Sequence, residues 1–209
     1  MSATDTPADR RQQIIAATLT QADEVGWEAV RLHRVAAALG LSLAELDAEF
    51  RDQDAIAEAW LAQADRAMLA PLEEGFRDLP PPQRIERALW RWLEALSSHK
   101  RVTGQILLGK LYPGHPHYVA ALVFRLSRTV QWLREAALLD GMPPRRQIEE
   151  IGLTWLFVAT VARWATDTSP GQARTRSFLR ARLGQADRFL GACRWRQSAA
   201  RPVAEVSIP

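Results

Sequence analysis

Apolar residues recur every three or four positions along most of the chain, which is the spacing of amphipathic α-helices. Ile15, Leu19, Ala22 and Val25 form one such stripe, and Gly26 is placed to end this first helix. The alternating pattern of β-strands is absent. The sequence therefore predicts an all-α protein of about nine helices. The further helices are expected at about 32–39, 43–50, 52–77 with a bend at Pro71, 83–97, 100–110, 117–139, 145–166 and from Pro170 onward.

The first three helices have the order of a helix-turn-helix and define an expected head at residues 1–50. Gly40 separates the second helix from the third. Ser42 and Glu45 match a capping box, in which each side chain satisfies a free backbone amide. The third helix is expected to bury one face and expose the other. The expected inward residues are Leu43, Leu46 and Phe50, and the expected outward residues are Glu45, Asp47, Ala48 and Glu49.

A larger helical domain is expected at 51–195, followed by a disordered tail at 196–209. The helix at 145–166 is apolar nearly all round over 151–162, which indicates burial on two sides. A second capping box at 169–172 precedes the last helix, whose apolar residues form a narrow stripe. Together the two helices favour a two-fold dimer with a four-helix bundle, and packing within one chain is the alternative. The residues assigned to the dimer interface are Leu156, Leu179, Leu183, Ala186 and Leu190.

The composition is that of a globular protein, with 47% hydrophobic residues among 209. The single cysteine, Cys193, permits no disulfide within the chain, which fits a reducing cytoplasm. No stretch reaches the roughly 20 apolar residues of a membrane span, and the polar N-terminus does not have the pattern of a signal peptide. We therefore expect a cytoplasmic protein without a transmembrane segment.

Charge is distributed unevenly along the chain. Residues 1–50 contain four arginines and eight acidic residues, which gives a formal charge of −4. Because the whole chain has a net charge of +3, the remaining residues carry +7. Seven arginines lie between Arg174 and Arg196. A DNA-binding domain usually concentrates positive charge, because neutralisation of phosphates supplies most non-specific affinity. The expected head is instead acidic, and its third helix has three carboxylates and no basic residue.

A set of residues near the N-terminus has the spacing of a known family: Gly26-Trp27, Val35-Ala36, Leu39-Gly40-Leu41-Ser42, Phe50 and Asp54. In these positions the chain resembles the tetracycline-repressor (TetR) family of transcriptional regulators. The resemblance implies an all-helical homodimer whose head binds operator DNA and whose larger domain holds a small effector. A bound effector would move the fourth helix and respace the two heads. The positions that the resemblance assigns to DNA contact are Arg31, His33, Arg34, Ser42, Leu43, Ala44 and Asp47.

Four positions depart from the family pattern. Leu43 and Gln53 stand where the family has lysine, Asp47 stands where it has tyrosine, and Glu49 stands where it has histidine. These family side chains contact phosphates. Neutral side chains at such positions reduce affinity for DNA, and carboxylates repel the phosphates.

A second resemblance rests on the Leu39-Gly40-Leu41-Ser42 turn, Asp167-Thr168-Ser169-Pro170, Thr175 and Phe178-Leu179. These residues are similar to the lipid-binding accessory proteins of coenzyme Q biosynthesis. Those proteins share the TetR-like fold, have lost DNA binding and hold an isoprenoid or a phospholipid. The membrane-docking helix of that family is not evident after Arg196. The alternative function is therefore a lipid- or isoprenoid-binding protein without DNA binding.

Tryptophans are the candidate lining of an apolar effector pocket, and ordinary core packing is the alternative. His115 and His117 lack a third metal ligand nearby and are typical of a solvent loop. No metal or cofactor is expected, and the absence of GxSxG, P-loop and dinucleotide-binding motifs disfavours an enzyme. The residues assigned to effector binding are Trp60, Trp90, Trp92, Trp132 and Trp155, with Trp164 on the same set of helices.

Overall fold

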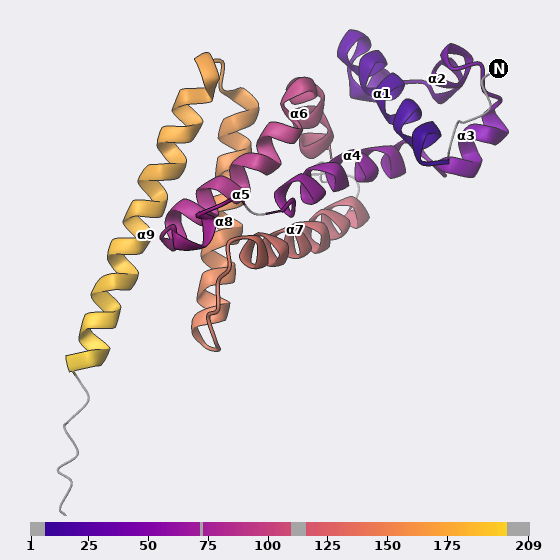
Figure 1. Ribbon diagram of the computed structural model, residues 1–209. Helices are drawn as coiled ribbons and strands as arrows, with labels where there is room; N and C mark the ends of the chain where they lie inside the picture. The colour runs from indigo at the N-terminus through magenta and orange to yellow at the C-terminus, as the bar shows by residue number, and fades with distance from the viewer. Residues whose placement is uncertain (1–6, 72, 110–115, 200–209) are drawn as a thin grey trace, which may run out of the picture.

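The described part of the chain is built from helices, with a small head at one end and a larger body at the other (Figure 1). The computed structural model describes the backbone of residues 7–71, 73–109 and 116–199, and the side chains of 8–71, 73–107, 125–144 and 146–188. The all-α prediction is confirmed. The α-helices are α1 (Pro7–Val25), α2 (Leu32–Ala38), α3 (Leu43–Glu49), α4 (Gln53–Met68), α5 (Pro81–Ala95), α6 (Lys100–Gly109), α7 (Pro116–Ala136), α8 (Arg145–Thr166) and α9 (Ala173–Ala199). Short 3-10 helices are η1 (Trp27–Ala29), η2 (Phe76–Asp78), η3 (Ser97–His99) and η4 (Pro170–Gln172).

The head consists of α1, α2 and α3, and its central turn depends on one glycine. Gly40 has a φ of +67°, a conformation that side-chain-bearing residues rarely adopt. The N–H of Leu41 then donates to the carbonyl of Ala36 at 2.9 Å. The predicted capping box is confirmed, because the N–H of Glu45 donates to Ser42 Oγ at 3.2 Å and the N–H of Ser42 donates to Glu45 Oε2 at 2.8 Å. The start of α3 is thereby fixed.

The third helix buries Leu46 and Phe50 as expected, but Leu43 is 56% exposed, so its predicted inward position is wrong. Leu43 is the first residue of α3. Because the Cα–Cβ bonds of a helix tilt toward its start, a side chain in the first turn projects past the end of the helix. The side chain of Leu43 therefore extends away from the core of the head.

The fourth helix is shorter than predicted. It ends at Met68, and the N–H of Leu69 still donates to the carbonyl of Asp65 at 3.1 Å. Pro71 lacks an N–H and disfavours a helical conformation in the residue before it, so it ends the helix instead of bending it. The next long helix begins at Pro81, where a proline removes no helical hydrogen bond.

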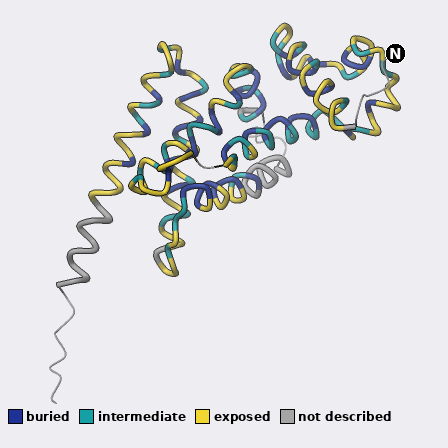
Figure 2. The backbone as a smooth tube through the Cα atoms, viewed as in Figure 1, coloured by how far each residue is buried: buried dark blue, intermediate teal, exposed yellow. Residues whose placement is uncertain are grey.

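The body packs α4 to α9 around a continuous apolar core (Figure 2). α5 lies against α4, α7 and α9, while α8 lies against α6, α7 and α9. The bounds of α8 are those predicted, since prolines precede it and a turn sequence follows it. Fully buried side chains from different helices, among them Met68, Leu93 and Trp164, fill the interior. No helix within the described ranges is long and apolar enough to cross a membrane.

A buried aspartate organises the connection between α8 and α9. The N–H and Oγ of Ser169 donate to Asp167 Oδ1 at 2.9 and 2.6 Å. The N–H and Oγ1 of Thr175 donate to Asp167 Oδ2 at 2.8 and 2.6 Å. The second predicted capping box is wrong, because the Ser169 side chain makes no capping hydrogen bond to η4, in which Gly171 and Gln172 have φ values of +58° and +56°. Asp167 supplies the acceptors that the capping box was expected to supply.

Candidate functional site

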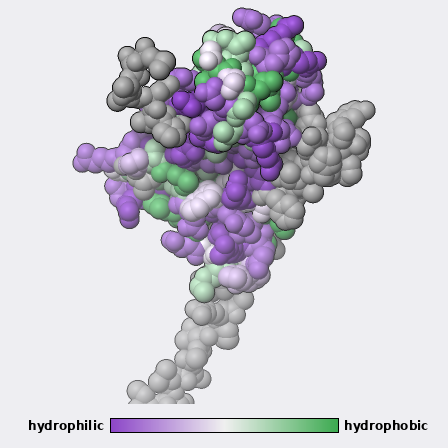
Figure 3. Space-filling model, turned by 90° about the vertical axis from the view of Figure 1, so that its right-hand side faces the viewer, coloured by the Kyte–Doolittle hydropathy of each residue, from purple (hydrophilic) through white to green (hydrophobic). Residues whose placement is uncertain are grey.

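The seven positions assigned to DNA contact all lie on the surface of the head. They come from α2 and the residue before it, from α3 and from the turn between these helices. Figure 3 views the molecule from the side of the head, and hydrophilic residues cover most of that face. Exposure allows these side chains to reach a ligand, and their contact with DNA stays a prediction. The exposed residues are Arg31, His33, Arg34, Ser42, Leu43, Ala44 and Asp47.

Two of the three carboxylates of α3 are engaged within the head. Glu45 accepts hydrogen bonds from the N–H and the Oγ of Ser42, both at 2.8 Å. These bonds hold the pKa of the Glu45 carboxyl below its usual value. Glu49 forms an ion pair with Arg11 at 3.6 Å, and Arg11 also lies 4.1 Å from the centre of the Phe50 ring. The acidic character of α3 is therefore partly used for structure.

Asp47 differs from these two carboxylates, because it is exposed and no hydrogen bond or ion pair joins it to the described residues. Gln53, where the family has lysine, donates from Nε2 to the carbonyl of Trp27 at 2.7 Å. Arg31 Nη1 donates to the carbonyls of Glu28 and Val30 at 3.1 and 2.8 Å. These contacts assign local structural roles to Gln53 and Arg31, which sequence reasoning had connected with DNA alone.

The head contacts the body through η3 and α6. The N–H of Trp27 donates to Gln105 Oε1 at 2.8 Å. Asp23 Oδ2 lies 2.5 Å from His99 Nδ1, and the carbonyl of Asp23 accepts a hydrogen bond from Arg101. A displacement of α6 would therefore also move the end of α1 and the residues that follow α1.

A partly buried polar cluster lies where α4, α5 and α7 meet. Arg125 Nη1 donates to Glu58 Oε2 at 2.6 Å, and its Nη2 donates to Asp65 Oδ2 at 3.3 Å. Trp92 Nε1 and Thr129 Oγ1 donate to Asp65 Oδ1 at 2.8 and 3.2 Å. Arg125 is only 7% exposed. A few fixed polar groups in apolar surroundings are typical of a site that orients a small ligand.

Sequence reasoning did not select Asp65, Arg125 or Thr129. One signal was present in the sequence, because Arg125 lies beside the apolar stripe of the helix predicted at 117–139. A charged residue next to such a stripe requires a buried partner or a ligand. The identity of that partner depends on how α4 packs against α7, which a single sequence does not specify.

The tryptophans assigned to an effector pocket have different environments. Trp60 is buried and donates from Nε1 to Thr103 Oγ1 at 3.0 Å. Trp92 is buried in the polar cluster, and the guanidinium of Arg176 lies 3.7 Å from the ring centre of Trp90. Trp132 and Trp155 are 46% and 57% exposed. Of this set, only Trp92 has its indole N–H among the groups that converge on Arg125 and Asp65.

The residues assigned to the dimer interface differ in their burial. Leu156, Leu179 and Leu183 are buried within the chain itself, and Ala186 is exposed. The side chain of Leu190 lies outside the described residues. Four other residues form the exposed apolar surface of α8. They are Ile148, which is 62% exposed, Ile151 (72%), Trp155 (57%) and Val158 (48%).

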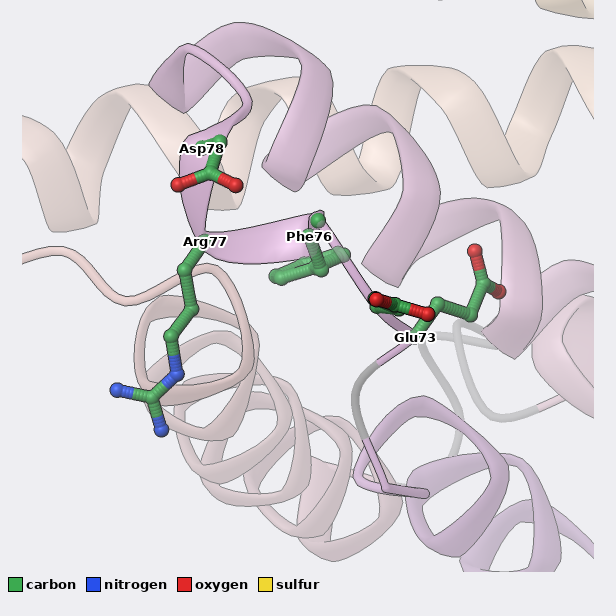
Figure 4. Close-up of a pocket in the computed structure, with 6 residues that line it drawn as sticks. Glu73, Phe76, Arg77 and Asp78 are labelled. Carbon is green, nitrogen blue, oxygen red and sulfur yellow. The ribbon is translucent and has the colours of Figure 1, made fainter.

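A shallow hollow of about 520 Å³ lies at the turn before α5 (Figure 4). It is lined by residues 73–78, and Glu73, Arg77 and Asp78 project to different sides of this turn. Glu73 forms ion pairs with Arg91 at 2.7 Å and Arg87 at 3.0 Å, and these lower the pKa of its carboxyl. The polar groups do not converge as a binding site requires. Elsewhere in the described residues, no three potential metal-binding side chains form a group.

Comparisons with known proteins agree with this architecture. The crystal structure of the TetR transcriptional regulator from Nitrosomonas europaea ATCC 19718 is similar with a TM-score of 0.76 and 37% sequence identity. The match covers 85% of this chain and 98% of that chain. A family model described as COQ9 matches residues 151–190. No curated protein matches the chain. Both resemblances inferred from the sequence are therefore confirmed as resemblances.

Proposed function

The chain belongs to the TetR family, and from this premise we propose that it is a homodimeric transcriptional regulator that binds operator DNA through its head and an effector through its body. The state of α3 is the observation that supports DNA binding most directly. Its start is fixed by the Ser42 capping box, and Glu45 and Glu49 are engaged inside the head. Of these carboxylates only Glu49 is paired with a cation, so Glu45 and Asp47 are the remaining sources of repulsion toward phosphates.

The exposed apolar face of α8 supports the dimer. Ile151, Trp155 and Val158 follow each other at the spacing of one helix face. Contiguous apolar residues that a single chain leaves exposed are typical of an interface between proteins. We assign the dimer contact to this face and to the exposed side of α9, where Ala181 and Gly184 are small enough for close helix approach.

The proposed effector site is the polar cluster of Asp65, Arg125 and Thr129 with Trp92. Asp65 lies on α4, which begins directly after the head. An effector that shifts α4 would change the spacing of the two heads in a dimer. We assign no catalytic activity to the chain. The single cysteine supports the cytoplasmic location that such a regulator requires.

A gel-shift titration with fragments of the source genome, including the region upstream of the coding sequence, tests DNA binding. The wild type is expected to retain a fragment at 50 mM salt and to lose affinity at 200 mM, because phosphate contacts release counterions. Arg34→Ala should weaken retention, and Arg128→Ala, which removes an exposed arginine of α7, should not. Absence of any retained fragment at 50 mM salt would contradict the proposal.

One observation favours a second candidate, a lipid- or isoprenoid-binding protein without DNA function. The COQ9 model matches residues 151–190, which include most of α8 and the Asp167 junction. Native mass spectrometry of the purified protein tests this candidate. A co-purified lipid together with no retained DNA fragment would favour it over the regulator.

A further inference from the structure

The exposed surface of α3 combines apolar side chains with a carboxylate that has no partner. Leu43, the first residue of α3, is 56% exposed, and Ala44 and Ala48 are exposed as well. Asp47 is also exposed, and among the described residues it accepts no hydrogen bond and forms no ion pair. This surface has no positive charge for phosphates. It instead presents apolar groups and two free acceptor oxygens.

The burial of α3 determines which of its side chains can reach DNA. Leu46 and Phe50 are buried in the head. Residues three and four positions apart lie on one face of a helix, so Ala44, Asp47 and Ala48 share the face opposite to Leu46. α3 follows the turn of a helix-turn-helix, and the helix at this place lies in the major groove in proteins with this motif. The alanine side chains are short, so they allow Asp47 to approach the edges of the bases.

A carboxylate distinguishes the four bases because it only accepts hydrogen bonds. In the major groove, cytosine presents the amino donor N4, guanine presents two acceptors and thymine presents the acceptor O4. Adenine presents the donor N6 directly beside the acceptor N7. An acceptor that faces a desolvated carboxylate leaves both groups without a hydrogen bond, which is costly. Asp47 therefore favours cytosine over the other three bases.

Leu43 and Ala44 provide the apolar contact that suits a neighbouring base. Thymine projects its C5 methyl group into the major groove, and apolar side chains contact this methyl group. One helical turn of about 5.4 Å separates Leu43 from Asp47, which corresponds to about one or two base-pair steps of 3.4 Å. The thymine is therefore expected within about two base pairs of the cytosine.

The other two carboxylates of α3 are engaged elsewhere. Glu45 accepts hydrogen bonds from the N–H and the Oγ of Ser42, and Glu49 forms an ion pair with Arg11. Positive charge for phosphates lies outside α3. Arg34 is exposed on α2 and forms no hydrogen bond or ion pair with the described residues. Because phosphate contacts position a protein on DNA and base contacts specify the sequence, α2 and α3 have different tasks.

We propose that α3 reads cytosine and thymine in the major groove. Asp47 accepts a hydrogen bond from N4 of cytosine, while Leu43 and Ala44 pack against the methyl group of thymine. This inference rests on the proposed regulator function and names the bases that the head selects. In a two-fold dimer the two bases occur once in each half-site. Asp47 lowers the affinity for every sequence because it repels phosphates, and it raises the ratio of affinities between sequences.

Selection of random DNA duplexes on the full chain at 50 mM salt, followed by sequencing of the retained molecules, tests the proposal. The wild type should enrich two half-sites, each with cytosine and thymine at fixed positions. Asp47→Asn replaces one acceptor oxygen by an amide donor, and an amide pairs with N6 and N7 of adenine. The same selection on Asp47→Asn should therefore replace the fixed cytosine by adenine.

Fluorescence anisotropy with the enriched duplex measures the size of each contact. Exchange of the fixed cytosine–guanine pair for thymine–adenine should weaken wild-type binding about tenfold, and this difference should disappear in Asp47→Asn. Exchange of the fixed thymine for uracil removes only the methyl group and should weaken wild-type binding about fourfold. Leu43→Ala should reduce this ratio between the thymine and uracil duplexes.

Glu24→Gln is the matched control, because it removes one negative charge from an exposed residue of α1 in the same head. It should keep the preference for cytosine, which separates recognition of the base from the charge of the head. Two results would overturn the inference and leave the regulator function intact. They are an unchanged preference for cytosine in Asp47→Asn and equal wild-type affinity for the thymine and uracil duplexes. If no sequence is enriched at 50 mM salt, the regulator function is contradicted and the inference fails with it.

Discussion

Gln53 Nε2 donates a hydrogen bond to the carbonyl of Trp27 at 2.7 Å, so the first residue of α4 is tied to the turn after α1. The N–H of the same tryptophan donates to Gln105 Oε1 on α6 at 2.8 Å. Trp27 is buried and therefore joins two body helices to the head through its own backbone. The orientation of the head is set by these two glutamines together with Asp23 and its partners His99 on η3 and Arg101 on α6.

Gln105→Ala should destabilise the protein by about 1–3 kcal/mol, because it leaves the N–H of a buried residue without its acceptor. Urea unfolding followed by circular dichroism measures the free energy of unfolding. Gln131→Ala is the control, since Gln131 is exposed on α7. An unchanged unfolding free energy in Gln105→Ala would show that this hydrogen bond does not hold the head.

Asp47→Lys should strengthen DNA binding. The substitution replaces an exposed carboxylate of α3 by a cation that reaches phosphates, and the slope of log affinity against log salt should steepen by about 0.9 for each phosphate gained. Fluorescence anisotropy with a retained fragment at several salt concentrations provides this slope. Glu74→Lys makes the same charge change at an exposed position before η2 and should have little effect. If the slope of log affinity against log salt is the same for Asp47→Lys and the wild type, α3 is not part of the DNA interface.

The helices of the head were predictable because their signals are local. Gly40, Ser42 and Glu45 lie within six positions of each other and fix the turn and the start of α3. The charge of the α3 surface was not predictable in the same way. Arg11 pairs with Glu49 across 38 positions, and only the tertiary fold of the head brings them together.

The same distinction holds in the body. The bounds of α8 follow from Pro143, Pro144 and the turn after Thr166. The periodicity does not predict which apolar residues of α8 are buried and which are exposed, because a helix that is apolar nearly all round could pack several of its faces against the core. Packing decided that Leu156 is buried and that Trp155 is exposed.

Trp155→Glu should convert the proposed dimer into a monomer. A carboxylate in the middle of the exposed face of α8 would be buried without a partner in the interface, which costs several kcal/mol. Light scattering after size-exclusion chromatography gives the mass. Val25→Glu is the control, because Val25 is an exposed apolar residue at the end of α1 in the head. A wild type with the mass of one chain would contradict the dimer itself.

Asp167→Asn should destabilise the protein at neutral pH and have a smaller effect in acid. The hydroxyls of Ser169 and Thr175 donate to Asp167 and, with their N–H groups, hold the pKa of its carboxyl far below the usual value. The folded protein therefore binds this proton more weakly than the unfolded chain. Such a group stabilises the fold at pH values above the ordinary carboxyl pKa of about 4, and this contribution is lost as the pH falls toward the folded pKa.

Melting temperatures of the wild type and Asp167→Asn between pH 7 and pH 2.5 measure this dependence. The substitution leaves one acceptor oxygen and places an amide N–H against donors of Ser169 or Thr175, so the melting temperature should be lower at pH 7. Protonation of the wild-type carboxyl creates a similar mismatch, so the two melting temperatures should converge in acid. Asp187→Asn, at an exposed position of α9, should follow the wild type throughout. A constant difference across the pH range would mean that the charge of Asp167 does not stabilise the junction between α8 and α9.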